Sequence, residues 1–114
     1  MVGIKVVSTG HAVPDKVVTN DDLSRVVDTN DEWIYSKTGI KERHFCENET
    51  NWELALKAAD TAIERAGIDK SEIGMLIVAT FTPDYATPSI ACVLHEKIGL
   101  RTDIPSFDLN AACA

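Results

Sequence analysis

The residue with the clearest chemical potential is a cysteine, Cys113, which follows the apolar stretch 104–109 (IPSFDL). That stretch predicts a strand, and Cys113 lies where a helix would begin after it. The positive end of a helix dipole favours a thiolate, and a thiolate is a nucleophile. The alternative is that Cys113 is a small buried hydrophobic residue, as free cysteines commonly are. We expect that second role for Cys46 and Cys92.

A second group of residues, in the stretch 29–44, could bind a nucleotide. Trp33 is followed within a short distance by Lys37, Lys41 and Arg43, which form a basic island in an acidic chain. An aromatic ring can stack on a base while neighbouring cations hold phosphate. The alternative is that Trp33 packs beneath the sheet and the cations form a solvated strand face.

The stretch 81–89 (FTPDYATPS) contains two prolines and two aromatic residues in one long connection. This composition is typical of a shaped loop, such as a lid or an interface loop. The alternative is an ordinary surface crossover between two elements.

The elements that must position these residues alternate along the chain. Strands are predicted at 4–9, 40–45, 74–80 and 104–109, and the uninterrupted apolar run at 74–80 predicts burial on both faces. Asn20 predicts the cap of a short helix, and a second short helix spans about 30–37 and ends at Gly39. Thr50 and Glu53 form a capping box for a longer helix that ends at Gly67. The last helix starts at Thr87 and Pro88, is apolar all round in its first half, and ends at Gly99. This order predicts an α/β fold with a largely parallel sheet.

Composition bounds the class of protein. The sequence has 114 residues, of which 45% are hydrophobic, which predicts one modest domain. Its formal net charge of −7 argues against binding to nucleic acid or to an anionic membrane. The apolar run 75–81 is too short to span a bilayer, and the first residues lack the features of a signal peptide. An odd number of cysteines without a C-x-x-C pair, and scattered histidines, predict a reduced, metal-free, cytoplasmic protein.

Five stretches together resemble the β-ketoacyl-acyl-carrier-protein synthase III family of the thiolase-like superfamily. They are VPDKVVTNDDL (13–23), DTNDEWI (28–34), KTGIKER (37–43), IVATFTPDYATPS (77–89) and FDLNAAC (107–113). The resemblance runs in order along essentially the whole chain, and it favours the nucleophilic role of Cys113. It implies the N-terminal part of a thiolase-like α-β-α-β-α layered fold with a mixed, mainly parallel sheet. Members are roughly three times longer, so residues 1–114 are expected to be the N-terminal portion of one condensing-enzyme domain, truncated just after its nucleophile.

The resemblance also implies a reaction and its partners. An acyl group, typically acetyl from acetyl-CoA, would be transferred to Cys113, and malonyl-acyl carrier protein would then lose CO2 and attack the thioester. No cofactor is implied, and the family is dimeric. The histidine and asparagine that polarise the second thioester lie further along the family's chains, and none of His11, His44 and His95 falls in a matching motif.

The same resemblance assigns roles to particular residues. Trp33 matches the tryptophan that stacks on the CoA adenine, and Thr29 matches a residue that contacts the same base. Lys37 stands where the family usually has arginine, so the charge is kept and the planar fork is lost. Thr87 falls where a residue shapes the partner subunit's primer pocket, and its small side chain suggests a primer bulkier than acetyl.

Two competing hypotheses remain at this stage. One is another thiolase-like enzyme, such as a 3-hydroxy-3-methylglutaryl-CoA synthase, a long-chain condensing enzyme or a quinolone-forming synthase. The other is a non-catalytic interaction or dimerisation module whose adhesive face is the helix at 89–98. A true module would be folded and monodisperse at this length, whereas a fragment of a sheet would expose edge strands and aggregate.

Overall fold

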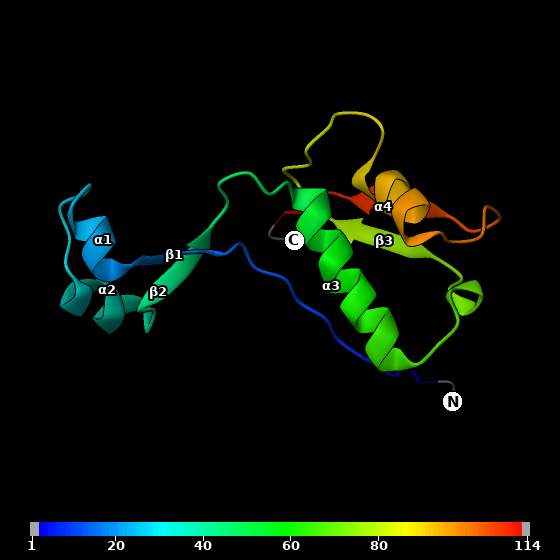
Figure 1. Cartoon of the computed structure of the whole chain (residues 1–114), viewed down its shortest axis with the longest axis horizontal. Helices are drawn as coiled ribbons and strands as arrows, with labels where there is room; N and C mark the ends of the chain where they lie inside the picture. The colour runs from blue at the N-terminus through cyan, green and yellow to red at the C-terminus, as the bar shows by residue number, and fades with distance from the viewer. Residues whose placement is uncertain (1–2, 113–114) are drawn as a thin grey trace. The chain divides into compact units, whose positions relative to one another are not determined.

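The computed structural model describes residues 3–112, and Cys113 therefore lies outside the described residues (Figure 1). These residues form two compact units. We call residues 13–49 the small unit, and residues 3–12 together with 50–112 the large unit. Each unit contains a two-stranded sheet and helices, so the predicted α/β class is confirmed.

The small unit is built on an antiparallel pair of strands. Strand β1 (Lys16–Thr19) pairs with β2 (Glu42–Phe45), with Lys16 opposite Phe45. Helices α1 (Asn20–Ser24) and α2 (Asp31–Thr38) lie between them in the chain. The predicted helix at 30–37 is confirmed as α2: the Asn30 side chain accepts a hydrogen bond from the Trp33 N–H at 2.8 Å, and Gly39 ends the helix at φ 69°.

The buried centre of the small unit is polar. Asn20 is 1% exposed, and its Nδ2 donates to Asp31 Oδ1 at 2.7 Å and to the Ile40 carbonyl at 2.8 Å. Its Oδ1 accepts from Arg43 Nη2 at 2.6 Å. The prediction that Asn20 caps α1 is therefore wrong. Thr19 is the cap, and it forms a capping box with Asp22, while the amide of Asn20 joins three segments of the unit.

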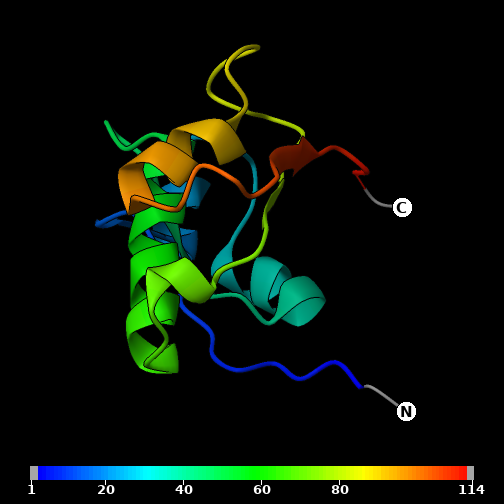
Figure 2. The same ribbon diagram turned by 90° about the vertical axis from the view of Figure 1, so that its right-hand side faces the viewer.

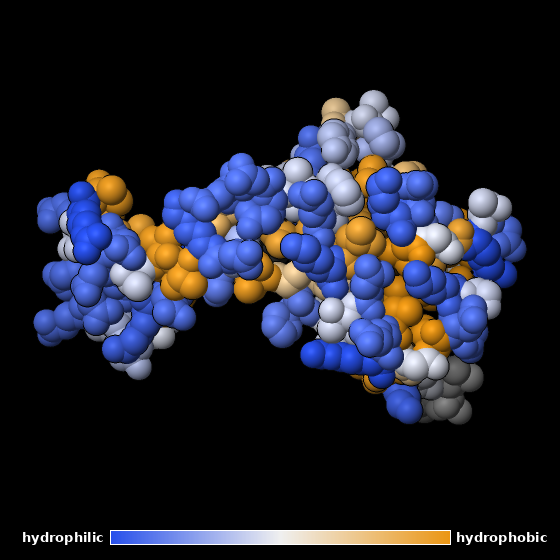
Figure 3. All heavy atoms as spheres, in the orientation of Figure 1, coloured by the Kyte–Doolittle hydropathy of each residue, from blue (hydrophilic) through white to orange (hydrophobic). Residues whose placement is uncertain are grey.

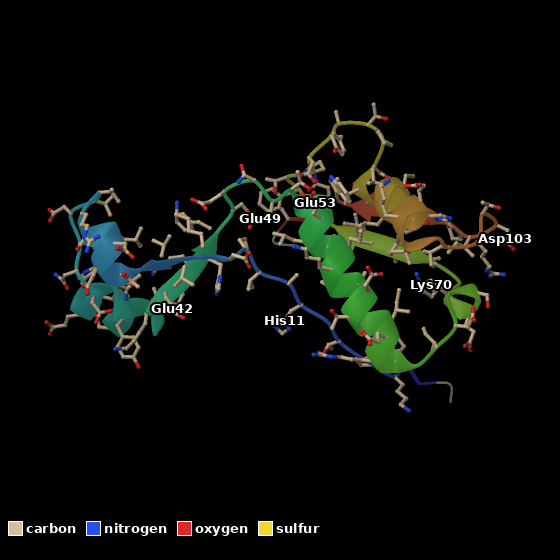
Figure 4. The ribbon with its side chains drawn as sticks, in the orientation of Figure 1. His11, Glu42, Glu49, Glu53, Lys70 and Asp103 are labelled. Carbon is tan, nitrogen blue, oxygen red and sulfur yellow. The ribbon has the colours of Figure 1, made fainter. Side chains whose placement is uncertain are left out.

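The large unit is built on a parallel pair of strands. Its elements are α3 (Asn51–Ala66), the 3-10 helix η1 (Lys70–Glu72), β3 (Leu76–Ala79), α4 (Ile90–Ile98) and β4 (Ser106–Leu109). Strands β3 and β4 pair in parallel with Leu76 opposite Ser106. The expected mainly parallel sheet is thus seen as one parallel and one antiparallel pair in residues 3–112. The predicted capping box of α3 is confirmed, since the Thr50 N–H donates to Glu53 Oε2 at 2.9 Å (Figure 4).

An apolar cluster forms the core of the large unit. Its buried members lie on α4 and on the segment after it: Ile90, Leu94, Ile98, Leu100 and Ile104. Side chains of α3 and β3 pack against this cluster, among them Leu56 and Val78. Figure 2 shows α3 and α4 on one side of the β3–β4 pair.

Only one face of the β3–β4 pair is covered, because both helices pack on the same side. Leu76 and Val78 point into the core, whereas Ile77, Phe107 and Leu109 are exposed. The prediction that the strand at 74–80 is buried on both faces is therefore wrong for this chain. Hydrophobic atoms reach the surface of both units in the view of Figure 3.

The predicted strand at 4–9 is also not observed, because no described segment forms a ladder with it. Residues 3–12 instead run along α3, where Ser8 Oγ donates to the Ala62 carbonyl at 2.6 Å. Gly10 permits this approach: a Cβ atom there would lie 2.1 Å from the Ala58 carbonyl oxygen and 2.7 Å from the Ala62 nitrogen. Any larger residue would push the segment off the helix.

The start of α4 also differs from its prediction. The helix begins at Ile90 and is capped by Ser89, whose Oγ accepts from the Cys92 N–H at 3.2 Å, so Thr87 and Pro88 belong to the preceding loop. The start at Ile90 is stabilised by Asp108, whose carboxylate accepts hydrogen bonds from the Ile90 and Ala91 N–H groups. The expectation that Cys46 and Cys92 are buried is wrong as well, since both are exposed.

Candidate active site

The first candidate region is a hollow at the ends of β3 and β4. It has a volume of about 390 Å³ and is lined by Ala79, Thr80, Phe81, Leu109, Ala111 and Ala112. Parallel strands end at the same edge of a sheet, and α/β proteins bind ligands outside the carboxyl ends of their strands. Small apolar side chains leave room there for an apolar group. The next residue in the chain after Ala112 is Cys113.

The backbone adopts an uncommon conformation beside this hollow. Ala112 has φ 44°, in the left-handed region that non-glycine residues seldom occupy. This conformation costs an L-residue about 1–2 kcal/mol. Strained backbone of this kind gathers at functional sites, where the surrounding structure holds a reactive group in place.

The loop that carries Thr87 is tied to α3. Both oxygens of Asp84 accept hydrogen bonds from the start of that helix, from the Asn51 N–H at 2.9 Å and the Trp52 N–H at 2.8 Å. The Asn51 side chain donates in return to Thr80 Oγ1 at 3.3 Å. Thr87 itself is exposed. These bonds hold the part of the loop around Asp84 against the start of α3. They favour a shaped loop over an unconstrained crossover.

The second candidate region is the exposed face of α2 in the small unit. The Trp33 side chain is 59% exposed, and Lys37 lies exposed one helical turn further on. The alternative in which Trp33 packs beneath the sheet is therefore wrong. An exposed indole with an ammonium group one turn away can stack on a base and attract a phosphate.

The other two cations of the predicted basic island are engaged within the small unit. Arg43 donates to the Val18 carbonyl at 3.1 Å as well as to Asn20. The Lys41 ammonium lies 4.8 Å from the centre of the Tyr35 ring, in a cation–π contact. Among the described residues Lys37 forms no ion pair.

Thr29 lies just before α2, and its hydroxyl is enclosed. Within residues 3–112, Oγ1 of Thr29 is buried and has no hydrogen-bond partner. The residue as a whole is only partly buried, so its accessible surface belongs to its other atoms. A base lying against Thr29 would thus contact its methyl group or backbone rather than its hydroxyl.

The structure places the predicted site residues in two separate groups. Thr29, Trp33 and Lys37 come together around α2 in the small unit, while Thr87 and the hollow that precedes Cys113 belong to the large unit. Sequence reasoning missed Asp84 and Asp108, which hold helix starts from a distance. For Asp108 the available signal was an acidic residue inside the apolar strand segment SFDL (106–109).

Residues 3–112 contain neither a metal-binding cluster nor a membrane-spanning helix. No group of three or more histidine, cysteine, aspartate or glutamate side chains in this range could hold a metal ion. No helix there has the length and apolarity to cross a membrane.

Comparison with known proteins identifies strong similarities. No family model matches the chain. It is 52% identical over 113 residues to a β-ketoacyl-[acyl-carrier-protein] synthase III of Clostridium acetobutylicum, covering 99% of this chain and 34% of that protein. A relative of the same name from Acholeplasma laidlawii is 50% identical over 112 residues, covering 97% of this chain and 36% of the relative. The crystal structure of a 3-oxoacyl-[acyl-carrier-protein] synthase III from Aquifex aeolicus superposes with a TM-score of 0.89 at 39% identity, covering 96% of this chain and 35% of that one.

These similarities confirm the resemblance and the fold predicted from the sequence. The chain spans about a third of the length of the curated relatives it matches, at 34% and 36% of their sequences.

Proposed function

Because the chain resembles the β-ketoacyl-[acyl-carrier-protein] synthase III family along nearly its whole length, we propose that it is a segment of such an enzyme. Residues 1–114 are the N-terminal portion of one condensing-enzyme domain. The similarity along nearly the whole chain is the observation that carries this proposal. The hollow at the ends of β3 and β4, which the chain enters just before Cys113, supports it.

The proposed reaction has two halves. In the first, the Cys113 thiolate attacks the carbonyl carbon of an acyl-CoA, the C–S bond to CoA breaks, and CoA leaves as a thiolate. In the second, malonyl-acyl carrier protein loses CO2, and the resulting carbanion attacks the acyl-cysteine. A new C–C bond forms, the β-ketoacyl carrier protein departs, and the thiolate is regenerated. Backbone N–H groups near the cysteine would stabilise each oxyanion, and the reaction needs no cofactor.

The acyl group is proposed to occupy the hollow. Its alanine and leucine lining suits a short hydrocarbon chain and offers few groups that would hydrolyse a thioester. The left-handed backbone at Ala112 turns the chain at the edge of the sheet, directly before Cys113 in the sequence.

The face of α2 is proposed to bind CoA. Trp33 would stack on the adenine, Thr29 would contact the same base through its accessible atoms, and Lys37 would attract a phosphate. A lysine acts on phosphate as a point charge, so we expect this contact to be weaker and less directional than the usual arginine contact. The exposure of Trp33 and Lys37 supports these roles.

The remaining assignments concern the assembly. We propose a homodimer in which Thr87 shapes the partner subunit's primer pocket and admits a primer bulkier than acetyl. The other partners are acetyl-CoA or a similar acyl-CoA, and malonyl-acyl carrier protein. The net charge of −7 supports an enzyme that binds neither nucleic acid nor anionic membranes, and we propose that it acts in the cytoplasm.

The test is the intact mass of the natural full-length gene product before and after incubation with acetyl-CoA, followed by peptide mapping. We expect one acetyl group on the Cys113 peptide and none after Cys113→Ala. Cys46 and Cys92 are exposed thiols in the same chain and serve as internal controls for non-specific acylation.

Other results of this test would contradict the proposal. Equal labelling of all three cysteines would remove the case for a catalytic thiol. In a parallel incubation with a long acyl-CoA, acylation of Cys113 that acetyl-CoA does not produce would favour a long-chain condensing enzyme. A protein without any adduct would favour a non-catalytic module.

A further inference from the structure

We propose that Asp108 is a positioning residue that sets the reactivity of Cys113. Its carboxylate joins the strand that leads into Cys113 to the helix that follows the Thr87 loop. Oδ2 accepts from the Ile90 N–H at 2.9 Å, and Oδ1 accepts from the Ala91 N–H at 2.7 Å. The inference rests on the proposed function, in which Cys113 is the nucleophile.

The contact is more than a routine helix cap. Helix α4 already has a local cap, because Ser89 Oγ accepts from the Cys92 N–H. Asp108 adds the two preceding amides from a different element, at a separation of 18 residues for Ile90 and 17 for Ala91. The first amides of a helix have no partner within the helix, so a carboxylate that bonds both holds the helix start firmly.

The position of Asp108 in the sheet explains how its contact with α4 could affect Cys113. Asp108 pairs with Val78 in the parallel ladder, and the next residue, Leu109, ends β4 and lines the hollow. Cys113 follows four residues after Leu109 in the chain. A change in the distance between β4 and the start of α4 would therefore move the wall of the hollow and the segment that leads into the thiol.

The chain contains a matched control for this proposal. Asp84 makes the same kind of contact, with both carboxylate oxygens on the first two amides of α3 at 2.9 and 2.8 Å. The two aspartates therefore give similar chemistry to two helix starts. They differ in that Asp84 lies on the loop at 81–89, whereas Asp108 lies on the strand that continues into Cys113.

The experiment compares Asp108→Asn with Asp84→Asn in the natural full-length protein. Two rates are measured for Cys113: single-turnover acylation by acetyl-CoA, and alkylation by iodoacetamide as a function of pH, with peptide mapping and Cys92 as the reference thiol. Misplacement of a reacting group by about 1 Å costs up to a hundredfold in rate. We expect Asp108→Asn to slow Cys113 acylation by about 10- to 100-fold and to displace its alkylation pH profile, and Asp84→Asn to leave that alkylation profile in place.

A second pair of variants keeps the test decisive if Asp108→Asn fails to fold. Asp108→Glu and Asp84→Glu keep the charge and both acceptor oxygens but move them by one methylene. A positioning role predicts that Asp108→Glu keeps a melting temperature close to that of Asp84→Glu and still acylates more slowly. Equal acylation and alkylation in the two glutamate variants would overturn the proposal and leave Asp108 as a helix cap only.

The two readouts also separate this inference from the proposed function. If the wild-type protein is not acylated at Cys113, the proposed function fails. The iodoacetamide profile still reports on Asp108, because alkylation requires no CoA site. An unchanged profile in both Asp108 variants would contradict the positioning role on its own.

Discussion

The two units of this chain are stabilised in opposite ways. The small unit surrounds a buried amide, Asn20, and Ile34 is its one buried hydrophobic residue within the described part of the chain. The large unit surrounds the apolar cluster of α4, in which Ile90, Leu94 and Ile98 are buried. A unit of 13–49 has too few residues for an apolar core of its own, so directional hydrogen bonds take its place.

This difference matches the two tasks we propose. A polar centre leaves the aromatic and cationic side chains of α2 free to face a ligand. An apolar core fixes the ends of β3 and β4, where a reactive thiol needs a rigid frame. The comparison predicts that the large unit is destabilised most by the loss of buried side-chain volume. The small unit should be destabilised most by the loss of buried hydrogen bonds.

The largest expected effect comes from Leu94→Ala. Leu94 is 2% exposed, and removing its buried side chain leaves a cavity that costs about 3 kcal/mol. Hydrogen exchange of the full-length protein, followed by mass spectrometry, should show amides of residues 90–109 exchanging roughly a hundredfold faster. Peptides from 13–49 should keep their wild-type rates. Equal acceleration of amide exchange in both units would show that they unfold together. It would contradict the view that the two units are stabilised separately.

A smaller effect, located in the small unit, is expected for Asn20→Leu. This nearly isosteric change removes the bonds to Asp31 and to the Ile40 carbonyl and leaves Arg43 Nη2 without its acceptor. Unpaired buried groups make the cost about 2 kcal/mol. Exchange should accelerate in peptides of 13–49 and remain unchanged in those of 90–109.

The matched control for this prediction is Asn48→Leu, the same substitution at an exposed position of the small unit. We expect it to change stability by less than about 0.5 kcal/mol. A loss as large as that of Asn20→Leu would mean that the burial of the Asn20 amide is not what makes its removal costly.

Local features of the fold were predictable from the sequence. The start and end of α2 depend on Asn30 and Gly39, and those of α3 on Thr50, Glu53 and Gly67, all of which act within a few residues. The shared face of Trp33 and Lys37 follows in the same way from the helical repeat.

Features that depend on distant partners were not predictable. The run at 4–9 has strand-forming residues, but no described segment pairs with it, so propensity alone gave the wrong answer. The role of Asn20 required knowledge that Asp31, Ile40 and Arg43 converge on it. The hollow at Ala79 and Leu109 depends on the register of β3 against β4, and Asp108 reaches α4 from a separate strand. No local feature of the sequence predicts these contacts between distant residues.

The smallest expected effect is the loss of stability of each unit at low pH, which should differ between the two units. The N–H groups of Glu47 and Asn48 donate to the Glu49 carboxylate and lower its pKa from 4.5 to about 2. In the same unit the Thr19 hydroxyl and backbone N–H lower the pKa of Asp22. In the large unit the Thr50 backbone N–H likewise lowers the pKa of Glu53, and the hydroxyl of Ser71 that of Asp69.

A carboxyl group whose pKa is lowered in the folded state stabilises the fold above its unfolded pKa, and this contribution is lost as the pH falls toward the folded value. Acidification from about pH 4.5 toward pH 2 should therefore loosen the caps of both units, but only the large unit keeps an apolar core that is insensitive to protonation. We expect exchange protection, corrected for intrinsic rates, to fall further in 13–49 than in 90–109, and Glu49→Gln to reduce the pH dependence of the small unit. Carboxyl titration of Glu49 by NMR gives the direct check. A Glu49 pKa near 4.5, or equal acid loss in the two units, would show that hydrogen bonding to exposed carboxylates does not distinguish them.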